Sequence, residues 1–143
     1  LPRCIIKCVL VIGEFKKSIH YSAIESDTIK LGKQMRLTYN ELVINRVPNP
    51  AVCGILCQGI DLVNYVMDLR SPQLYAMIRT SRVSLLRSLD EIYSLPRVIS
   101  CIAQLKNIAL ETAIKAESSI VNALDRSTKP PSAPQRHGSL RIV

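Results

Sequence analysis

The sequence has no tryptophan, one phenylalanine and only five glycines among its 143 residues. Because aromatic residues make up just 4% of the chain, there are few rings on which single-stranded bases could stack. The glycines form no G-x-G-x-x-G, G-x-x-x-x-G-K-[ST] or G-x-S-x-G motif. This excludes the common phosphate-binding loops and the nucleophile elbow of hydrolases.

Histidine is also scarce, with His20 and His137 as the two examples. Neither belongs to an H-E-x-x-H or E-x-x-H motif, which excludes zinc-protease and di-iron sites of those types. The adjacent carboxylates Asp90 and Glu91 would point in different directions on a helix. We therefore expect no enzyme activity, no catalytic residues, no cofactor and no metal site.

Long apolar runs are missing too. The longest stretch without a charged residue, 47–60, has 14 residues and contains two prolines. A membrane-spanning helix requires about 18 or more consecutive apolar residues. The sequence therefore predicts no transmembrane helix.

Aliphatic side chains and positive charge are what the chain has in quantity. Hydrophobic residues make up 48% and charged residues 21%, a balance typical of one packed domain. The net charge is +8, and residues 127–143 contain basic residues but no acidic ones. This distribution favours an acidic partner, such as nucleic acid or an anionic membrane surface.

The strongest periodic signal covers residues 96–126. Its apolar residues recur every three or four positions, which places them on one face of a helix. Pro96 suits a first helical turn, and Pro130 and Pro131 would stop the pattern. The sequence therefore predicts one long helix here. Its periodic residues are Val98, Ile102, Leu105, Ala109, Ala113 or Ala116, Ile120 and Leu124.

Weaker helical spacing precedes this segment. Ser26 or Asp27 would cap one helix, and Ser71 followed by Pro72 resembles the start of another. A buried strand over residues 4–12, ending at Gly13, is an alternative for the first segment. The helices predicted in this part of the chain cover residues 3–25, 26–45, 50–69 and 71–94.

Short links between consecutive helices are typical of antiparallel neighbours. We therefore predict an all-α fold, an antiparallel up-and-down bundle of about five helices that occupies residues 1–126. Residues 127–143 are rich in proline and serine, are basic and lack periodicity, which predicts a flexible tail.

Four of the five cysteines form C-x3-C pairs, Cys4 with Cys8 and Cys53 with Cys57, and Cys101 stands alone. The pairs resemble the twin C-x3-C proteins of the mitochondrial intermembrane space. The resemblance implies two disulfides between antiparallel helices. Four thiolates could instead bind zinc, although zinc ligands usually come in closer pairs. A third interpretation treats the cysteines as small buried apolar residues, which free cysteines often are.

Basic side chains are the candidate contacts to phosphate. They lie at intervals of three to five residues, which would bring them to one side of a helix. A solvated face of mixed charge would have the same composition. The candidates are Lys30, Lys33, Arg36, Arg79, Arg82 and Arg87.

The tail contains one short motif that resembles a known recognition peptide. The tetrapeptide Pro131-Ser132-Ala133-Pro134 is similar to the P-[ST]-A-P peptide with which viral matrix or Gag proteins and some endosomal adaptors recruit the ESCRT-I complex. Such a peptide docks in an extended conformation, which a flexible tail allows. A tail rich in proline, serine and alanine could also contain these four residues by chance.

From these observations we expect a structural, adaptor or assembly protein that binds other proteins through grooves between its helices. Gly54 and Gly59 would allow close approach of a partner helix, and the protein could form oligomers. The alternatives are a nucleic-acid-binding component of a ribonucleoprotein or capsid, and a viral matrix-like protein that recruits budding machinery. The expected location is the cytoplasm, or the mitochondrion if a targeting segment has been removed.

Overall fold

The structure, a computed structural model, describes residues 8–17 and 21–128 of the chain. These residues form a four-stranded sheet, two long helices and one short 3-10 helix. In chain order the elements are β1 (Val11–Lys16), α1 (Tyr21–Ile44), β2 (Val52–Gln58), β3 (Asp61–Ser71), β4 (Leu74–Ser84), η1 (Leu89–Ser94) and α2 (Leu95–Thr128).

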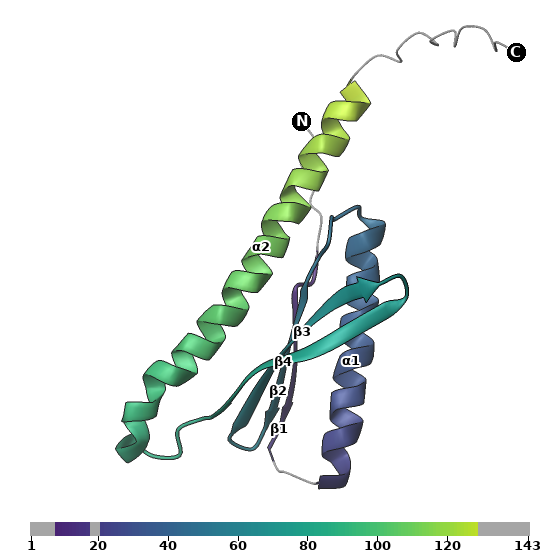
Figure 1. Ribbon diagram of the computed structural model, residues 1–143. Coiled ribbons are helices and arrows are strands. Elements are labelled where there is room, and N and C mark those ends of the chain that lie inside the picture. The colour runs from purple at the N-terminus through teal and green to yellow at the C-terminus, as the bar shows by residue number, and fades with distance from the viewer. Residues whose placement is uncertain (1–7, 18–20, 129–143) are drawn as a thin grey trace, which may run out of the picture.

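The sheet lies between the two long helices, with α1 on one face and α2 on the other (Figure 1). The strand order is β1-β2-β3-β4. β1 is parallel to β2, whereas β2, β3 and β4 are joined by hairpins and pair antiparallel. The parallel pair needs a long crossover connection, and α1 provides it.

The side of the sheet covered by α1 holds the larger part of the core. Residues on α1 that recur every three or four positions pack onto β2 and β3. Gly54 lies beneath this helix, where Met35 and Leu31 occupy the space that a side chain would need. The buried residues of this cluster are Leu31, Met35, Tyr39, Leu42, Val47, Val52, Leu56 and Met67, and Ala116 of α2 joins it from the other helix.

On the opposite side, α2 packs against β2, β3 and β4 through two smaller clusters. Val98 contacts the cluster of Cys57, Leu62 and Val83, and Leu105 and Ala109 contact Cys53. Two hydrogen-bonded positions anchor the helix further. The Asn64 side-chain amide donates to the Cys101 carbonyl at 3.1 Å. The Thr112 hydroxyl donates to the Ala51 carbonyl and accepts from its amide, both at 3.1 Å.

The prediction of an all-α five-helix bundle is wrong, because four strands form a mixed sheet. The predicted helix over residues 50–69 is the β2–β3 hairpin, with Gly59 in its turn at a φ of +59°. β2 is buried on both faces, so its apolar residues do not alternate with polar ones. A continuous apolar run of this kind fits a helical period as well as a strand.

The predicted helix over residues 71–94 is also wrong. Pro72 lies in the tight turn between β3 and β4 rather than in a first helical turn, and Gln73 follows with a φ of +68°. Proline followed by a residue of positive φ is typical of a type II turn. The rest of the segment forms β4 and η1.

Two predicted helices are confirmed, with shifted ends. α1 begins at Tyr21, earlier than the predicted 26–45, and α2 covers Leu95–Thr128 in place of 96–126. The helix predicted over residues 3–25 is wrong over 11–16, which form β1. The alternative strand ended at Gly13, whereas β1 continues to Lys16. Within the described residues, neither helix has an apolar stretch long enough to cross a membrane.

Candidate functional site

Much of α2 presents apolar side chains to the surface. The helix buries Val98, Leu105, Ala109 and Ala116 against the sheet, and a second row lies about a quarter turn around the helix. The side chains of this second row are between 47% and 56% exposed. We call it the α2 stripe. Its apolar members are Ile99, Ile102, Leu110, Ile114 and Val121.

The α2 stripe also contains two charged residues, Lys106 and Glu117, both exposed. On a helical projection they lie between Ile102 and Ile114 in angle, near the middle of the stripe. Neither forms an ion pair with another residue in the described part of the chain. The stripe is therefore an apolar surface with one unpaired positive and one unpaired negative charge.

A groove of about 380 Å³ runs beside the α2 stripe, between α2 and the edge of the sheet. Among the described residues, Lys106 is the one charged residue that lines it. The edge of the sheet supplies one wall, through Val11 of β1, Ile55 of β2 and Leu10, the residue before β1. The helix supplies the other, through Ile102, Leu105, Lys106, Ala109, Leu110 and Ala113.

The strand that borders the groove is an edge strand. β1 pairs with β2 on one side, and no other described strand pairs with its outer side. Val11 and Phe15 lie on the same face of β1 and are 42% and 68% exposed. The ring of Phe15 lies over Gly13, where a Cβ would come within 2.5 Å of it. The apolar surface of α2 thus continues onto the edge of the sheet.

Figure 1 shows how α2 is placed in the molecule. In this view the first turns of α2 lie beside the sheet, and its last turns extend beyond the ends of the strands. Hydrogen bonds tie the middle of the helix to the loop before β2, from Lys115 to the Asn49 carbonyl and from Ser119 to the Arg46 carbonyl. The side of α2 that faces away from the sheet and this loop carries no other described element.

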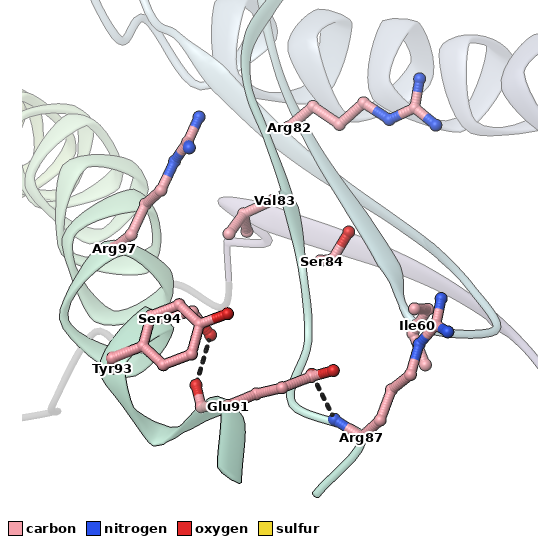
Figure 2. Close-up of a pocket in the computed structure, with 9 residues that line it drawn as sticks. All are labelled: Ile60, Arg82, Val83, Ser84, Arg87, Glu91, Tyr93, Ser94 and Arg97. Atoms are coloured by element: carbon pink, nitrogen blue, oxygen red, sulfur yellow. Dashed lines mark hydrogen bonds between the residues drawn. The ribbon is translucent and has the colours of Figure 1, made fainter.

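A second hollow, of about 490 Å³, lies near the start of α2 and is lined by three arginines (Figure 2). Arg82 comes from β4, Arg87 from the segment after it, and Arg97 from α2. Figure 2 shows the three guanidinium groups spread around the pocket rather than converging on one point. The remaining lining residues are Ile60, Val83, Ser84, Glu91, Tyr93 and Ser94.

Two acidic residues form hydrogen bonds with arginines of this hollow, which we call the basic pocket. Arg82 donates to Asp61 at 3.0 Å, and this bond holds the pKa of the Asp61 carboxyl below its usual value. Ser84 donates to the other oxygen of the same carboxylate at 3.0 Å. Glu91 accepts a hydrogen bond from the backbone amide of Arg87. The pocket is positive overall but is not an isolated cluster of cations.

The two glycines predicted to line a partner groove lie elsewhere. Gly54 is in the middle of β2 beneath Met35, inside the core, and Gly59 is in the β2–β3 turn. Neither lines the groove beside α2. Their predicted role depended on a helix over residues 50–69, which the strands replace.

The predicted phosphate contacts divide into two groups. Lys30, Lys33 and Arg36 are exposed on α1, and Lys30 donates to Glu14 at 3.1 Å. Arg82 and Arg87 line the basic pocket, whereas Arg79 does not. The tail motif Pro131, Ser132, Ala133 and Pro134 lies outside the described residues.

The described cysteines are free thiols. Cys53 and Cys57 are buried in β2, and Cys8 is exposed. Burial raises the pKa of Cys53 to about 11, and its thiol donates to the Leu105 carbonyl at 3.6 Å. These two cysteines match the interpretation as small buried apolar residues. Among the described residues, no group of three or more histidine, cysteine or acidic side chains could hold a metal ion.

Sequence reasoning missed the α2 stripe and the contribution of Arg97 to the basic pocket. A signal for the stripe was present, because residues 96–126 carry aliphatic side chains on more than one face. Ile99, Leu110 and Val121 fall outside the row that we predicted to face the core. A helix that is apolar all round is usually buried, whereas one at the surface of a domain usually has a single apolar face. No comparable signal existed for Arg97, because only the folding of the chain brings it near Arg82.

Comparisons with protein-family descriptions, curated proteins and solved structures find no match to this chain.

Proposed function

We propose that this protein is a non-enzymatic adaptor or assembly protein that binds another protein along the α2 stripe. The observation that carries the proposal is the continuous apolar surface formed by the stripe, the groove and the exposed side of β1. Scattered exposed apolar residues are ordinary, but a contiguous patch of this kind typically marks an interaction site. The nearly complete lack of charge along the groove suits a partner that is itself apolar on one side.

The geometry of the surface favours a helical partner. The groove follows the axis of α2, and its walls are aliphatic. Leu110, Ile114 and Val121 are separated by four and seven residues, a spacing at which the side chains of a second helix can interdigitate. Amphipathic helices bind in apolar grooves through residues spaced in this way.

Site-specific photo-crosslinking tests the proposal. A photoreactive amino acid at Leu110 should give a discrete covalent adduct in cells that express the full chain. The same amino acid at Gln104, which is exposed on another side of α2, is the matched control. Mass spectrometry of the adduct would identify the partner. Equal labelling at both positions, or no adduct at Leu110, would contradict the proposal.

A second candidate function is binding of a polyanion such as nucleic acid. The supporting observation is that two predicted phosphate contacts, Arg82 and Arg87, line one pocket together with Arg97. Their spread suits several phosphates along an extended chain better than a single phosphate group. The test is retention on heparin as salt is raised, since phosphate contacts weaken steeply with salt. Arg97→Gln should elute at lower salt than the parent, whereas Arg36→Gln on α1 should not.

A further inference from the structure

The surface of α2 carries a pattern that is complementary to itself. We propose that the α2 stripe binds the α2 stripe of a second copy, with the two helices antiparallel. This inference rests on the proposed function, because it names the occupant of the same surface. It follows from the positions of the two charged residues within α2.

The two charges lie symmetrically in the helix. Lys106 is eleven residues after Leu95, the first residue of α2, and Glu117 is eleven residues before Thr128, the last residue of α2 that the structure describes. Consider two copies of α2 packed side by side and antiparallel, with the first residue of each helix next to the last residue of the other. Lys106 of each copy then lies opposite Glu117 of the other. The pairing uses the whole described length of α2, and a two-fold axis relates the copies.

This register gives both charged residues of the stripe an ion-pair partner. Lys106 and Glu117 lack ion-pair partners among the described residues, and each gains one in the pair of helices. Two such pairs form, one on each side of the two-fold axis. A parallel pairing would instead place Lys106 beside Lys106 and Glu117 beside Glu117, and like charges repel. The charges thus favour the antiparallel arrangement.

The apolar residues fit the same register. Ile102 of one copy lies opposite Val121 of the other, and Leu110 lies opposite Ala113, which places a large side chain against a small one. Figure 1 shows that the last turns of α2 extend beyond the sheet. In the proposed pair these turns lie against the first turns of the other helix. Each copy therefore covers the exposed Val121 of the other, and the pairing buries the middle of the stripe.

Charge reversal tests the inference with the full chain. Sedimentation velocity should show a concentration-dependent dimer for the parent over about 1–100 μM, the range in which moderate affinities are measured. Lys106→Glu and Glu117→Lys should each raise the dissociation constant about tenfold or more, since each puts like charges opposite one another twice. The double variant should restore the parent value. Glu111→Lys, an exposed charge reversal outside the stripe, should leave it unchanged.

Each other result overturns the inference. A parent chain that stays monomeric shows that the occupant is not a second copy. A dimer that neither reversal weakens, or that the double variant does not restore, shows that the register is not the antiparallel one. The photo-crosslink at Leu110 separates this failure from failure of the proposed function: a discrete adduct with another protein retains the proposed function, and no discrete adduct rejects both.

Discussion

Met35 on α1 lies directly against Gly54 on β2, so that a Cβ at residue 54 would come within 2.5 Å of the Met35 sulphur. Both residues are buried, and Leu31 closes the same space from the neighbouring turn of α1. Glycine at this position allows the helix to approach the sheet closely. The distance between α1 and β2 therefore depends on this pair.

Gly54→Ala should destabilise the protein by about 1–3 kcal/mol, the usual cost of overpacking a core. Met35→Ala alone should also destabilise it, because it leaves a cavity. The double variant should lose at least about 1 kcal/mol less than the two single losses together, since the new methyl group fills part of the cavity. Urea denaturation measures all three. Additive losses would show that the two side chains do not share the space.

Gly32→Ala is the control for this experiment. A Cβ there would meet only the sulphur of Met77 at 3.2 Å, the end of a flexible side chain. Alanine also favours a helix by up to about 1 kcal/mol over glycine. Gly32→Ala should therefore cost much less than Gly54→Ala.

The Thr112 hydroxyl is the second position at which one substitution should have a clear effect. It bonds to both the amide and the carbonyl of Ala51, and Thr112 is buried. Thr112→Val keeps the shape but removes both bonds, and it should destabilise the protein by about 1–3 kcal/mol because the Ala51 amide loses its partner. Thr112→Ser retains the hydroxyl and should cost less. Equal losses for valine and serine would contradict a role for the hydrogen bonds.

Asp27 should make stability depend on pH. Lys16 donates to its carboxylate and lowers its pKa, and Gln58 donates a second bond at 3.1 Å, whereas burial acts in the opposite direction. Because the pKa is lowered in the folded state, the ionised carboxylate stabilises the fold at pH values above the pKa of Asp27 in the unfolded chain, which is about 4. That contribution is lost as the pH falls through the folded pKa.

Asp27→Asn should therefore be less stable than the parent at pH 6, and the gap should narrow at pH 3. Urea denaturation at the two pH values measures it. The exposed Asp90, which forms no ion pair with the described residues, supplies the control variant Asp90→Asn. A gap that is constant with pH would show that the ionised carboxylate of Asp27 does not stabilise the fold.

Thiol reactivity should distinguish two cysteines of the native chain. Cys53 is fully buried with a pKa of about 11, so at pH 8 only about one thiol in a thousand is the reactive thiolate. Cys8 is exposed. Brief labelling with iodoacetamide should modify Cys8 and spare Cys53, and labelling in denaturant should modify both. Comparable native labelling of the two would mean that β2 opens readily.

Sequence reasoning located the long helices better than the strands for a physical reason. Val98, Leu105, Ala109 and Ala116 recur at helical spacing because one face of α2 packs on the sheet. No strand had an equally clear period. In β2, every residue except Ile55 is buried, since α1 and α2 cover opposite faces. Two-sided burial removes the alternation by which a strand is recognised.

The β3–β4 hairpin was missed for a different reason. Asn64 in β3 is buried although it is polar, because its amide bonds to the Cys101 carbonyl on α2. A polar residue at an inward position conceals the strand pattern. Ser71 and Pro72 resemble a helix cap followed by a first-turn proline, and the same pair suits the turn that the structure contains. Local sequence does not distinguish a helix start from a turn here. The distinction depends on whether the flanking residues pair with strands that are distant in sequence.

The predicted position of the groove was wrong. We expected a groove between helices beside Gly54, whereas the apolar groove in the structure lies beside Leu110, because the strand that forms its other wall was predicted to be part of a helix. Arg82 and Arg87 were predicted to act together, and the structure brings them to one pocket. Arg97 joins them through tertiary structure alone.

The burial of β2 on both faces also bears on how this sequence can change over time. A strand with one solvent-exposed face accepts polar residues at every second position, but β2 offers no such positions, because its burial does not alternate. A saturation mutagenesis screen should therefore show low tolerance at consecutive residues from Val52 to Gln58. In β4, where buried and exposed positions are mixed, tolerance should vary from residue to residue. β2 is thus the segment in which related chains should diverge most slowly.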